Sequence, residues 1–163
     1  EANKIQNISE FATKANFRLK AEELETDIVN YLTEYITNIL PSINNKSLEI
    51  LFQNNVEKEV IKKIKPIEIN ILIDNLVVNS RKAKSSKLFI SLSELNGKLF
   101  FEFKDNGIGI NPNELKRIFE FGYTTTDGSG LGLYHVNQIV SNLKGKIEVQ
   151  NNSDRGVTFK III

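Results

Sequence analysis

The sequence contains no cysteine, no methionine and no tryptophan, and its one histidine is His135. Without cysteine the chain has no disulfide, no thiolate nucleophile and no cysteine-ligated zinc. A single histidine disfavours both a histidine-based metal site and a Ser-His-Asp triad. The lack of cysteine also fits a cytoplasmic protein, which is the location that we expect.

An excess of charge and a long apolar run are also missing. The net charge is +1, from 21 basic and 20 acidic residues, so we expect neither a nucleic-acid partner nor an anionic membrane partner. No apolar run approaches membrane-spanning length, and we expect no signal peptide. The 163 residues fit one domain with one core. Because the chain starts at Glu1 and lacks methionine, we expect a fragment, with residues 1–15 as the remainder of an upstream connector and residues 16–163 as the domain.

Apolar periodicity predicts an α+β protein. The sequence predicts helices over 25–40, 66–83 and 131–143, and strands over 16–22, 47–53, 58–64, 87–95, 98–105, 146–150 and 156–163. Pro41 is expected to stop the first helix, Pro66 to open the second, and Gly145 to end the third. Asn96-Gly97 between two alternating runs is a strong hairpin signal. We therefore expect a two-layer α/β sandwich, with a mixed, mostly antiparallel sheet and three main helices on one face.

The second predicted helix carries amides in an otherwise apolar stretch. Asn75 and Asn79 are four residues apart, so their side chains project side by side, and Lys82 extends this polar stripe. The stripe is offset by roughly 100° from the apolar core stripe. The core stripe consists of Ile69, Leu72, Ile73, Leu76, Ser80 and Ala83. The amides indicate either a ligand site, where they find partners, or a pair at the solvent boundary.

Two glycine-rich stretches follow this helix. "DNGIGI" (105–110) comes directly after a predicted strand, and is either a tight turn or a loop that lets a ligand touch the backbone. "GSGLGL" (128–133) precedes the third helix, whose N-terminus suits a phosphate, although a flexible loop with a helix cap is the alternative. Its spacing differs from the G-x-G-x-x-G of dinucleotide folds, and no G-x-x-x-x-G-K-[ST] loop is present. The long segment 106–130, with one helical turn expected at 111–119, is typical of a lid or binding loop.

The order of these motifs is more specific than any one of them. It resembles the ATP-binding catalytic domain of sensor histidine kinases, in the Bergerat-type superfamily of gyrase, heat-shock chaperone and mismatch-repair ATPases. The resemblance covers residues 25–163. "NLVVNSRKA" (75–83) is similar to the family's N box, "DNGIGI" to its G1 box, "RIFEFGYTT" (117–125) to its F box, "GSGLGL" to its G2 box, and "RGVTFKI" (155–161) to its closing strand.

The resemblance implies ATP and Mg²⁺ as cofactors. Asp105 would accept a hydrogen bond from the exocyclic amine of adenine, and Asn79 would hold Mg²⁺ through its amide oxygen. Asn75 would lie beside the phosphates, and Lys82 would reach a phosphate oxygen. These expected contacts with Mg²⁺ and the phosphates imply catalytic roles for Asn75, Asn79 and Lys82. Residues 111–129 would form a mobile lid. The other implied cofactor-binding residues are Gly107, Gly109, Ile110, Tyr123, Thr124, Thr125, Gly128, Ser129, Gly130, Leu131, Gly132, Leu133 and Thr158.

One position separates the branches of this superfamily. Hydrolytic members carry a glutamate four residues before the metal-binding asparagine, as the base that activates water. Here that position is Asn75, which takes no proton at neutral pH. This favours transfer of the γ-phosphoryl group to an outside nucleophile, such as a histidine imidazole. An ATPase of the same fold, a nucleotide-switched binding module and a serine kinase of a regulatory protein remain alternatives.

The resemblance also implies partners. These are a histidine phosphoacceptor and dimerisation domain that is absent from this chain, and a response regulator receiver domain. The isolated domain would be a monomer and the full-length protein a homodimer. His135 follows the G2 box, so we expect it to be structural or adjacent to the nucleotide. Thr126 stands where many relatives have a lysine, which would lower the affinity for the nucleotide.

Overall fold

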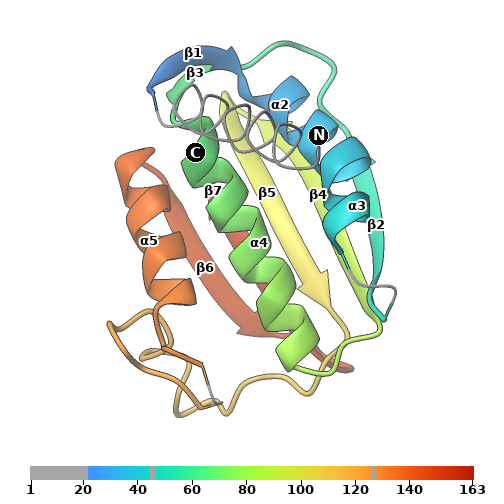
Figure 1. Cartoon of the computed structure of the whole chain (residues 1–163), viewed down its shortest axis with the longest axis vertical. Helices are drawn as coiled ribbons and strands as arrows, with labels where there is room; N and C mark the ends of the chain where they lie inside the picture. The colour runs from blue at the N-terminus through green and yellow to red at the C-terminus, as the bar shows by residue number, and fades with distance from the viewer. Residues whose placement is uncertain (1–21, 45–46, 126–127) are drawn as a thin grey trace, which may run out of the picture.

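A computed structural model describes residues 22–44, 47–125 and 128–163. It is an α+β fold of two layers, with the helices over one face of a five-stranded sheet (Figure 1). The strand order is β2-β4-β5-β7-β6. These strands are β2 (Glu49–Asn54), β4 (Lys87–Leu95), β5 (Lys98–Asp105), β7 (Val157–Ile162) and β6 (Lys146–Asn151). The expected fold class is confirmed, whereas the expected connector over 1–15 and all but the last residue of the expected strand over 16–22 lie outside the described residues.

The sheet is mixed and mostly antiparallel, as predicted. The pairs β4–β5, β5–β7 and β6–β7 are antiparallel, and β2 runs parallel to β4 at the edge. Asn96 and Gly97 join β4 to β5 with φ values of 54° and 78°. Two left-handed central residues match the twist of a tight hairpin, so the Asn-Gly signal is confirmed.

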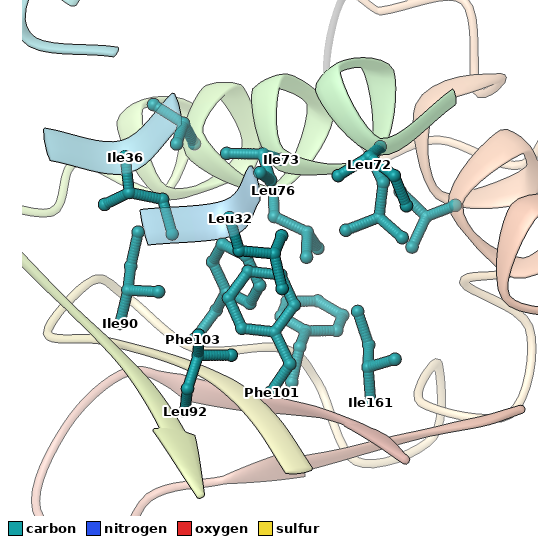
Figure 2. Packing of buried hydrophobic residues seen from close by; sticks show 14 of the residues in the cluster. Leu32, Ile36, Leu72, Ile73, Leu76, Ile90, Leu92, Phe101, Phe103 and Ile161 are labelled. Atoms are coloured by element: carbon teal, nitrogen blue, oxygen red, sulfur yellow. The ribbon is translucent and has the colours of Figure 1, made fainter. Parts of the chain in front are cut away.

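Helix α4 (Pro66–Lys82) lies across this sheet and carries the apolar stripe that the sequence predicts. Figure 2 shows Leu72, Ile73 and Leu76 of α4 above Phe101 and Phe103 of β5, all of them buried. Each fully buried side chain of this kind contributes about 1.5–3 kcal/mol to folding. Within the described ranges, no helix is both long and apolar enough to cross a membrane.

The N-terminal helix begins later than predicted. Residues Leu24–Asp27 form strand β1, which pairs antiparallel with β3 (Ile61–Ile64) in a separate two-stranded sheet. Helix α2 (Ile28–Glu34) starts after Asp27, whose Oδ1 accepts from the Val29 N–H at 3.2 Å. The expected start at residue 25 is wrong because an N-cap and a long-range strand pair take these residues.

The same helix also continues past Pro41. It passes through a π-helical turn, η1 (Tyr35–Ile39), into α3 (Leu40–Ile43). Proline has no N–H, so it costs a helical hydrogen bond only at a position whose N–H would otherwise have a partner. Pro41 stands in the first turn of α3, directly after the wide π turn. The expected stop at Pro41 is therefore wrong.

Helix α5 (Gly132–Asn142) lies beside α4 (Figure 1). It ends just before Gly145, near the predicted stop, and the left-handed residue after it is Lys144, with φ of 57°. The Gly145 N–H then donates to the Val140 carbonyl at 2.9 Å. A Cβ on Gly145 would lie 2.5 Å from the Ile162 carbonyl oxygen, so packing requires this glycine. The helical turn expected at 111–119 is a series of turns instead.

A polar seam joins α4 to the N-terminal helix. The Tyr35 hydroxyl donates to Asp74 Oδ1 at 2.8 Å, and the Tyr31 hydroxyl donates to Asn70 Oδ1 at 2.7 Å. Burial raises the pKa of Asp74 although the Tyr35 hydrogen bond acts against it, and burial likewise raises the pKa of Tyr35. The seam fixes the rotation of α4 about its own axis, and so the direction in which its other polar stripe points.

Candidate functional site

A cavity of about 480 Å³ lies between α4, the end of β5, residues of the stretches 108–125 and 128–130, and the start of α5. Its size suits a small-molecule ligand. Apolar side chains, among them Val78, Ile118 and Phe159, form part of its wall. It brings together the following residues predicted from the sequence: Asn75, Asn79, Lys82, Asp105, Gly109, Ile110, Tyr123, Thr124, Thr125, Gly128, Ser129, Gly130, Gly132 and Leu133.

Asp105 is the buried acid of this cavity, with 5% of its surface exposed. Its Oδ1 accepts from the N–H groups of Gly107 at 2.9 Å and Val157 at 3.1 Å. Its Oδ2 accepts from the Ser80 hydroxyl at 3.3 Å. Since each carboxylate oxygen has about two acceptor sites, the free capacity of Asp105 lies on Oδ2. The sequence placed Ser80 in the core stripe, and a hydroxyl among apolar residues was the only sign of this second role.

Asn75 and Asn79 lie one turn apart on α4, both partly buried. Asn75 Nδ2 donates to the Ile71 carbonyl at 2.8 Å. A Cβ on Gly132 would lie 2.7 Å from Asn75 Oδ1, so glycine lets the start of α5 approach α4 closely. Asn79 Nδ2 is buried and finds no hydrogen-bond partner within the described part of the chain. Asn79 lines the cavity, so its amide oxygen is the candidate atom for a contact with a ligand.

Aromatic rings among residues 117–123 make contacts within this segment and with β7. The Arg117 guanidinium lies 4.5 Å from the centre of the Tyr123 ring. The rings of Phe119 and Phe159 meet edge-on with their centres 6.4 Å apart. Tyr123 and Phe159 both line the cavity, so these contacts form one of its walls.

Three predicted site residues do not line the cavity. Gly107 lies against the end of α4, where a Cβ would meet the Ala83 carbonyl oxygen at 2.6 Å. The Leu131 N–H approaches the Ser129 hydroxyl at 3.4 Å, just before α5. Thr158 donates its hydroxyl to Asn152 Oδ1 at 2.6 Å, outside the cavity. His135 is also outside it, and Thr126 is not among the described residues.

The turn between β6 and β7 contacts the site in a way that the sequence reading missed. "NNSDRG" (151–156) was read only as a turn, yet Gly156 lies directly against Asp105. Its φ is +90°, and a Cβ there would collide with the Asp105 carbonyl oxygen. Side chains of the same turn bind the loop "DNGIGI". Asparagine and glycine are common in any turn, so composition gave no sign of this contact.

We expect Gly156→Ala to lower the free energy of unfolding by about 2–4 kcal/mol, because it combines a left-handed backbone with a collision. Gly97→Ala is the matched control, since Gly97 has φ of +78° but nothing within 4 Å of its added Cβ. It should cost only the backbone term of about 1–2 kcal/mol. Urea unfolding followed by circular dichroism measures both losses. Equal losses would mean that the contact with Asp105 is not tight.

Comparisons with known proteins agree on one family. Residues 64–163 match the family model described as "Histidine kinase-, DNA gyrase B-, and HSP90-like ATPase". The chain is 30% identical over 168 residues to the histidine protein kinase SaeS of Staphylococcus epidermidis, a match that covers 98% of this chain and 47% of that protein. The chain thus spans less than half the length of this relative.

Solved structures share the fold. The catalytic domain of histidine kinase ThkA aligns with a TM-score of 0.72 at 24% identity, covering 87% of this chain and 95% of that one. Full-length ShkA in complex with AMPPNP aligns with a TM-score of 0.71 at 23% identity, covering 86% of this chain and 30% of that one.

Proposed function

Because the chain belongs to the family of histidine kinase-, DNA gyrase B- and HSP90-like ATPases, we propose that residues 16–163 are the ATP-binding catalytic domain of a sensor histidine kinase. This domain binds Mg·ATP and transfers the γ-phosphoryl group to a histidine on a separate domain. The observation that carries the proposal is a single cavity with the buried carboxylate of Asp105, the amides of Asn75 and Asn79, and the glycine-flanked start of α5. The named histidine kinase SaeS supports it.

The end of the cavity at Asp105 suits adenine. The free acceptor capacity of Oδ2 would take an N–H of the exocyclic amine of adenine. Guanine carries a carbonyl oxygen at that position, which would leave two acceptors facing each other. Apolar residues such as Val78, Ile118 and Phe159 suit the faces of a purine ring. The AMPPNP complex of ShkA supports a nucleotide as the ligand.

The start of α5 suits the phosphates. No side chain caps its N-terminus, and its first turn contains no acidic residue, so its first N–H groups remain available to an anion. Gly128, Gly130 and Gly132 line this part of the cavity and let phosphate oxygens approach the backbone. Lys82 lines the cavity as well and is exposed, so its ammonium group would add a point charge at the phosphates.

The donor set at Asn79 fits Mg²⁺ that arrives with a nucleotide. Among the described residues, no group of three or more His, Cys, Asp or Glu side chains could hold a metal ion. Asn79 offers one amide oxygen, with its Nδ2 buried. Mg²⁺ is commonly held by one or two protein oxygens together with substrate phosphates and water. When bound, it would neutralise charge on the transferred phosphoryl group. Asn79 would orient the ion, and we expect no Mg²⁺ binding without nucleotide.

Asn75 favours transfer over hydrolysis. Its amide is neutral and already donates to the Ile71 carbonyl, so it accepts no proton from water. The carboxylate of Glu114 also lines the cavity, but it lies on the segment after β5 and not at the position of Asn75 on α4. A domain that positions the γ-phosphoryl group without activating water suits an external nucleophile such as a histidine imidazole.

The partners of the whole protein belong to the same proposal. We infer a dimerisation and phosphoacceptor domain that presents the histidine, and a response regulator receiver domain that takes the phosphoryl group afterwards. The whole protein would be a homodimer, the isolated domain a monomer, and the location cytoplasmic. The relative SaeS, a histidine protein kinase of about twice the length of this chain, supports this arrangement.

A phosphotransfer assay tests the proposal. The chain is incubated with Mg²⁺, ATP labelled at the γ-phosphate and phosphoacceptor domains taken from histidine kinases. We expect label on the acceptor in the acid-labile, base-stable form of phosphohistidine, and none on an acceptor whose histidine is replaced by glutamine. Steady release of inorganic phosphate without transfer would indicate an ATPase instead. Binding of ATP with neither reaction would indicate a nucleotide-switched binding module.

A further inference from the structure

The loop "DNGIGI" is fixed by side chains of the β6–β7 turn. Asn152 Nδ2 donates to the carbonyl oxygen of Asp105 at 2.9 Å, at the end of β5. Arg155 Nε donates to the carbonyl oxygen of Gly107 at 3.1 Å. These contacts join segments about fifty residues apart in the sequence, and they hold the backbone from which the Asp105 carboxylate projects.

Asn151 fixes the other end of the loop. Its Nδ2 donates to the Ile110 carbonyl at 2.6 Å, and its Oδ1 accepts from the Ile110 N–H at 2.9 Å. A Cβ on Gly109 would lie 3.1 Å from Asn151 Oδ1, so glycine at this position leaves room for the amide. The loop is therefore tied to the β6–β7 turn at its start, middle and end.

Thr158 supports the orientation of the Asn152 amide. Its hydroxyl donates to Asn152 Oδ1 at 2.6 Å, while Asn152 Nδ2 donates to the carbonyls of Asp105 and Arg155 at 2.9 and 3.1 Å. If the amide were rotated by 180°, its oxygen would face two carbonyl oxygens, and no hydrogen bond to them would form. The Thr158 hydroxyl thus supports the one orientation in which Asn152 holds Asp105.

We propose that Thr158 and Asn152 are positioning residues for the base end of the site, with Thr158 acting through Asn152 on the backbone of Asp105. This inference rests on the proposed function, in which Asp105 reads the adenine amine. The chain Thr158–Asn152–Asp105 holds the backbone from which the carboxylate projects, while the N–H groups of Gly107 and Val157 hold its Oδ1. Neither positioning residue lines the cavity, so neither touches the nucleotide.

The test compares two ligands that differ by a single group. ATP and purine riboside triphosphate, which lacks the exocyclic amine, are titrated with Mg²⁺ into the wild type, Thr158→Val and Thr158→Ser by calorimetry. Valine keeps the shape of threonine without its hydroxyl, and serine keeps the hydroxyl. We expect Thr158→Val to weaken ATP binding about three- to tenfold, the usual size for one neutral hydrogen bond. Binding of the amine-free analogue should be unchanged, and Thr158→Ser should behave as the wild type.

A control and a double variant sharpen the test. Lys160→Ala lies on the same strand and face, removes the 2.9 Å ion pair with Glu102, and should leave both affinities unchanged. Asn152→Ala should match Thr158→Val, and the double variant should lose no more than either single one. If Thr158→Val does not fold by circular dichroism, Asn152→Ala decides by the same measurements.

Any one of three results would overturn this inference and leave the proposed function standing. They are an unchanged affinity of Thr158→Val for ATP, an equal loss for both ligands, and an equal loss in Thr158→Ser. A wild-type domain that binds ATP no better than the amine-free analogue would instead overturn the proposed reading of adenine by Asp105, and the inference with it.

Discussion

Asp105→Asn is expected to weaken Mg·ATP binding by about 10- to 100-fold, because a charge-assisted hydrogen bond contributes roughly 1.5–3 kcal/mol. The two N–H groups of Gly107 and Val157 already face Oδ1, so the asparagine oxygen would take that place. Its NH₂ group would then take the place of Oδ2 beside the Ser80 hydroxyl. There it would meet the adenine amine as one donor facing another, so that hydrogen bond would be lost. Calorimetric titration of the folded variant with Mg·ATP measures the loss.

Asp74→Asn is the matched control for this variant. Asp74 lies on α4, is partly buried and accepts from the Tyr35 hydroxyl at 2.8 Å, but it does not line the cavity. An asparagine oxygen accepts the same hydrogen bond, so the domain should fold and keep its affinity for ATP. If Asp105→Asn bound ATP as tightly as Asp74→Asn, Asp105 would not be the residue that reads the base.

Asn79→Ala is expected to slow Mg²⁺-dependent phosphotransfer by at least about 100-fold, in line with the loss of one preorganised contact to the reacting group. The variant removes the amide oxygen through which the chain would orient the ion. The assay uses a supplied phosphoacceptor domain over a range of Mg²⁺ concentrations. A second measurement compares the ATP affinity with Mg²⁺ and with a chelator, and the ratio of the two affinities should fall toward one in Asn79→Ala.

Asn70→Ala supplies the control on the same helix. Asn70 accepts from the Tyr31 hydroxyl at 2.7 Å in the polar seam and does not line the cavity. Its loss should lower stability while the Mg²⁺ dependence of ATP binding and transfer persists. Full transfer activity in Asn79→Ala would mean that the metal is held by other oxygens.

The elements predicted well from the sequence are those specified by local signals. Helix α4 has an apolar stripe of helical period and a proline in its first turn, and Asn96-Gly97 specifies the β4–β5 hairpin. These signals lie within the elements themselves. The residues around the cavity followed from the order of the motifs, and the structure brings most of them to one place.

The predictions that failed depend on contacts between residues far apart in the sequence or on an irregular helical turn. Strand β1 forms because its residues pair with β3, more than thirty positions later. The helix passes Pro41 because a π-helical turn precedes it, which apolar periodicity alone does not indicate. Gly145 follows the end of α5 as predicted, but the left-handed residue there is Lys144, and Gly145 is required for packing against the end of β7.

The hydrogen bonds that hold the candidate site in place were equally hard to predict from the sequence. Ser80 counted as a core residue, although it donates to Asp105. Asn151, Asn152 and Arg155 have the composition of an ordinary turn, and their partners lie more than forty residues earlier. Thr158 was predicted to bind the nucleotide, whereas it lies outside the residues that line the cavity and its hydroxyl donates to Asn152. No local pattern encodes contacts of this range.

The position of β5 has a consequence for local unfolding. This strand pairs with β4 on one side and β7 on the other, and it ends at Asp105. Amide protons of such a doubly paired strand exchange with solvent only in the largest openings of a domain. The described residues 111–125 and 128–131, some of which line the cavity, form no strand or helix, so their amide protons should exchange in smaller openings than those of β5. Under the proposed function, this wall of the cavity would open at a lower free-energy cost than the end of β5 that carries Asp105.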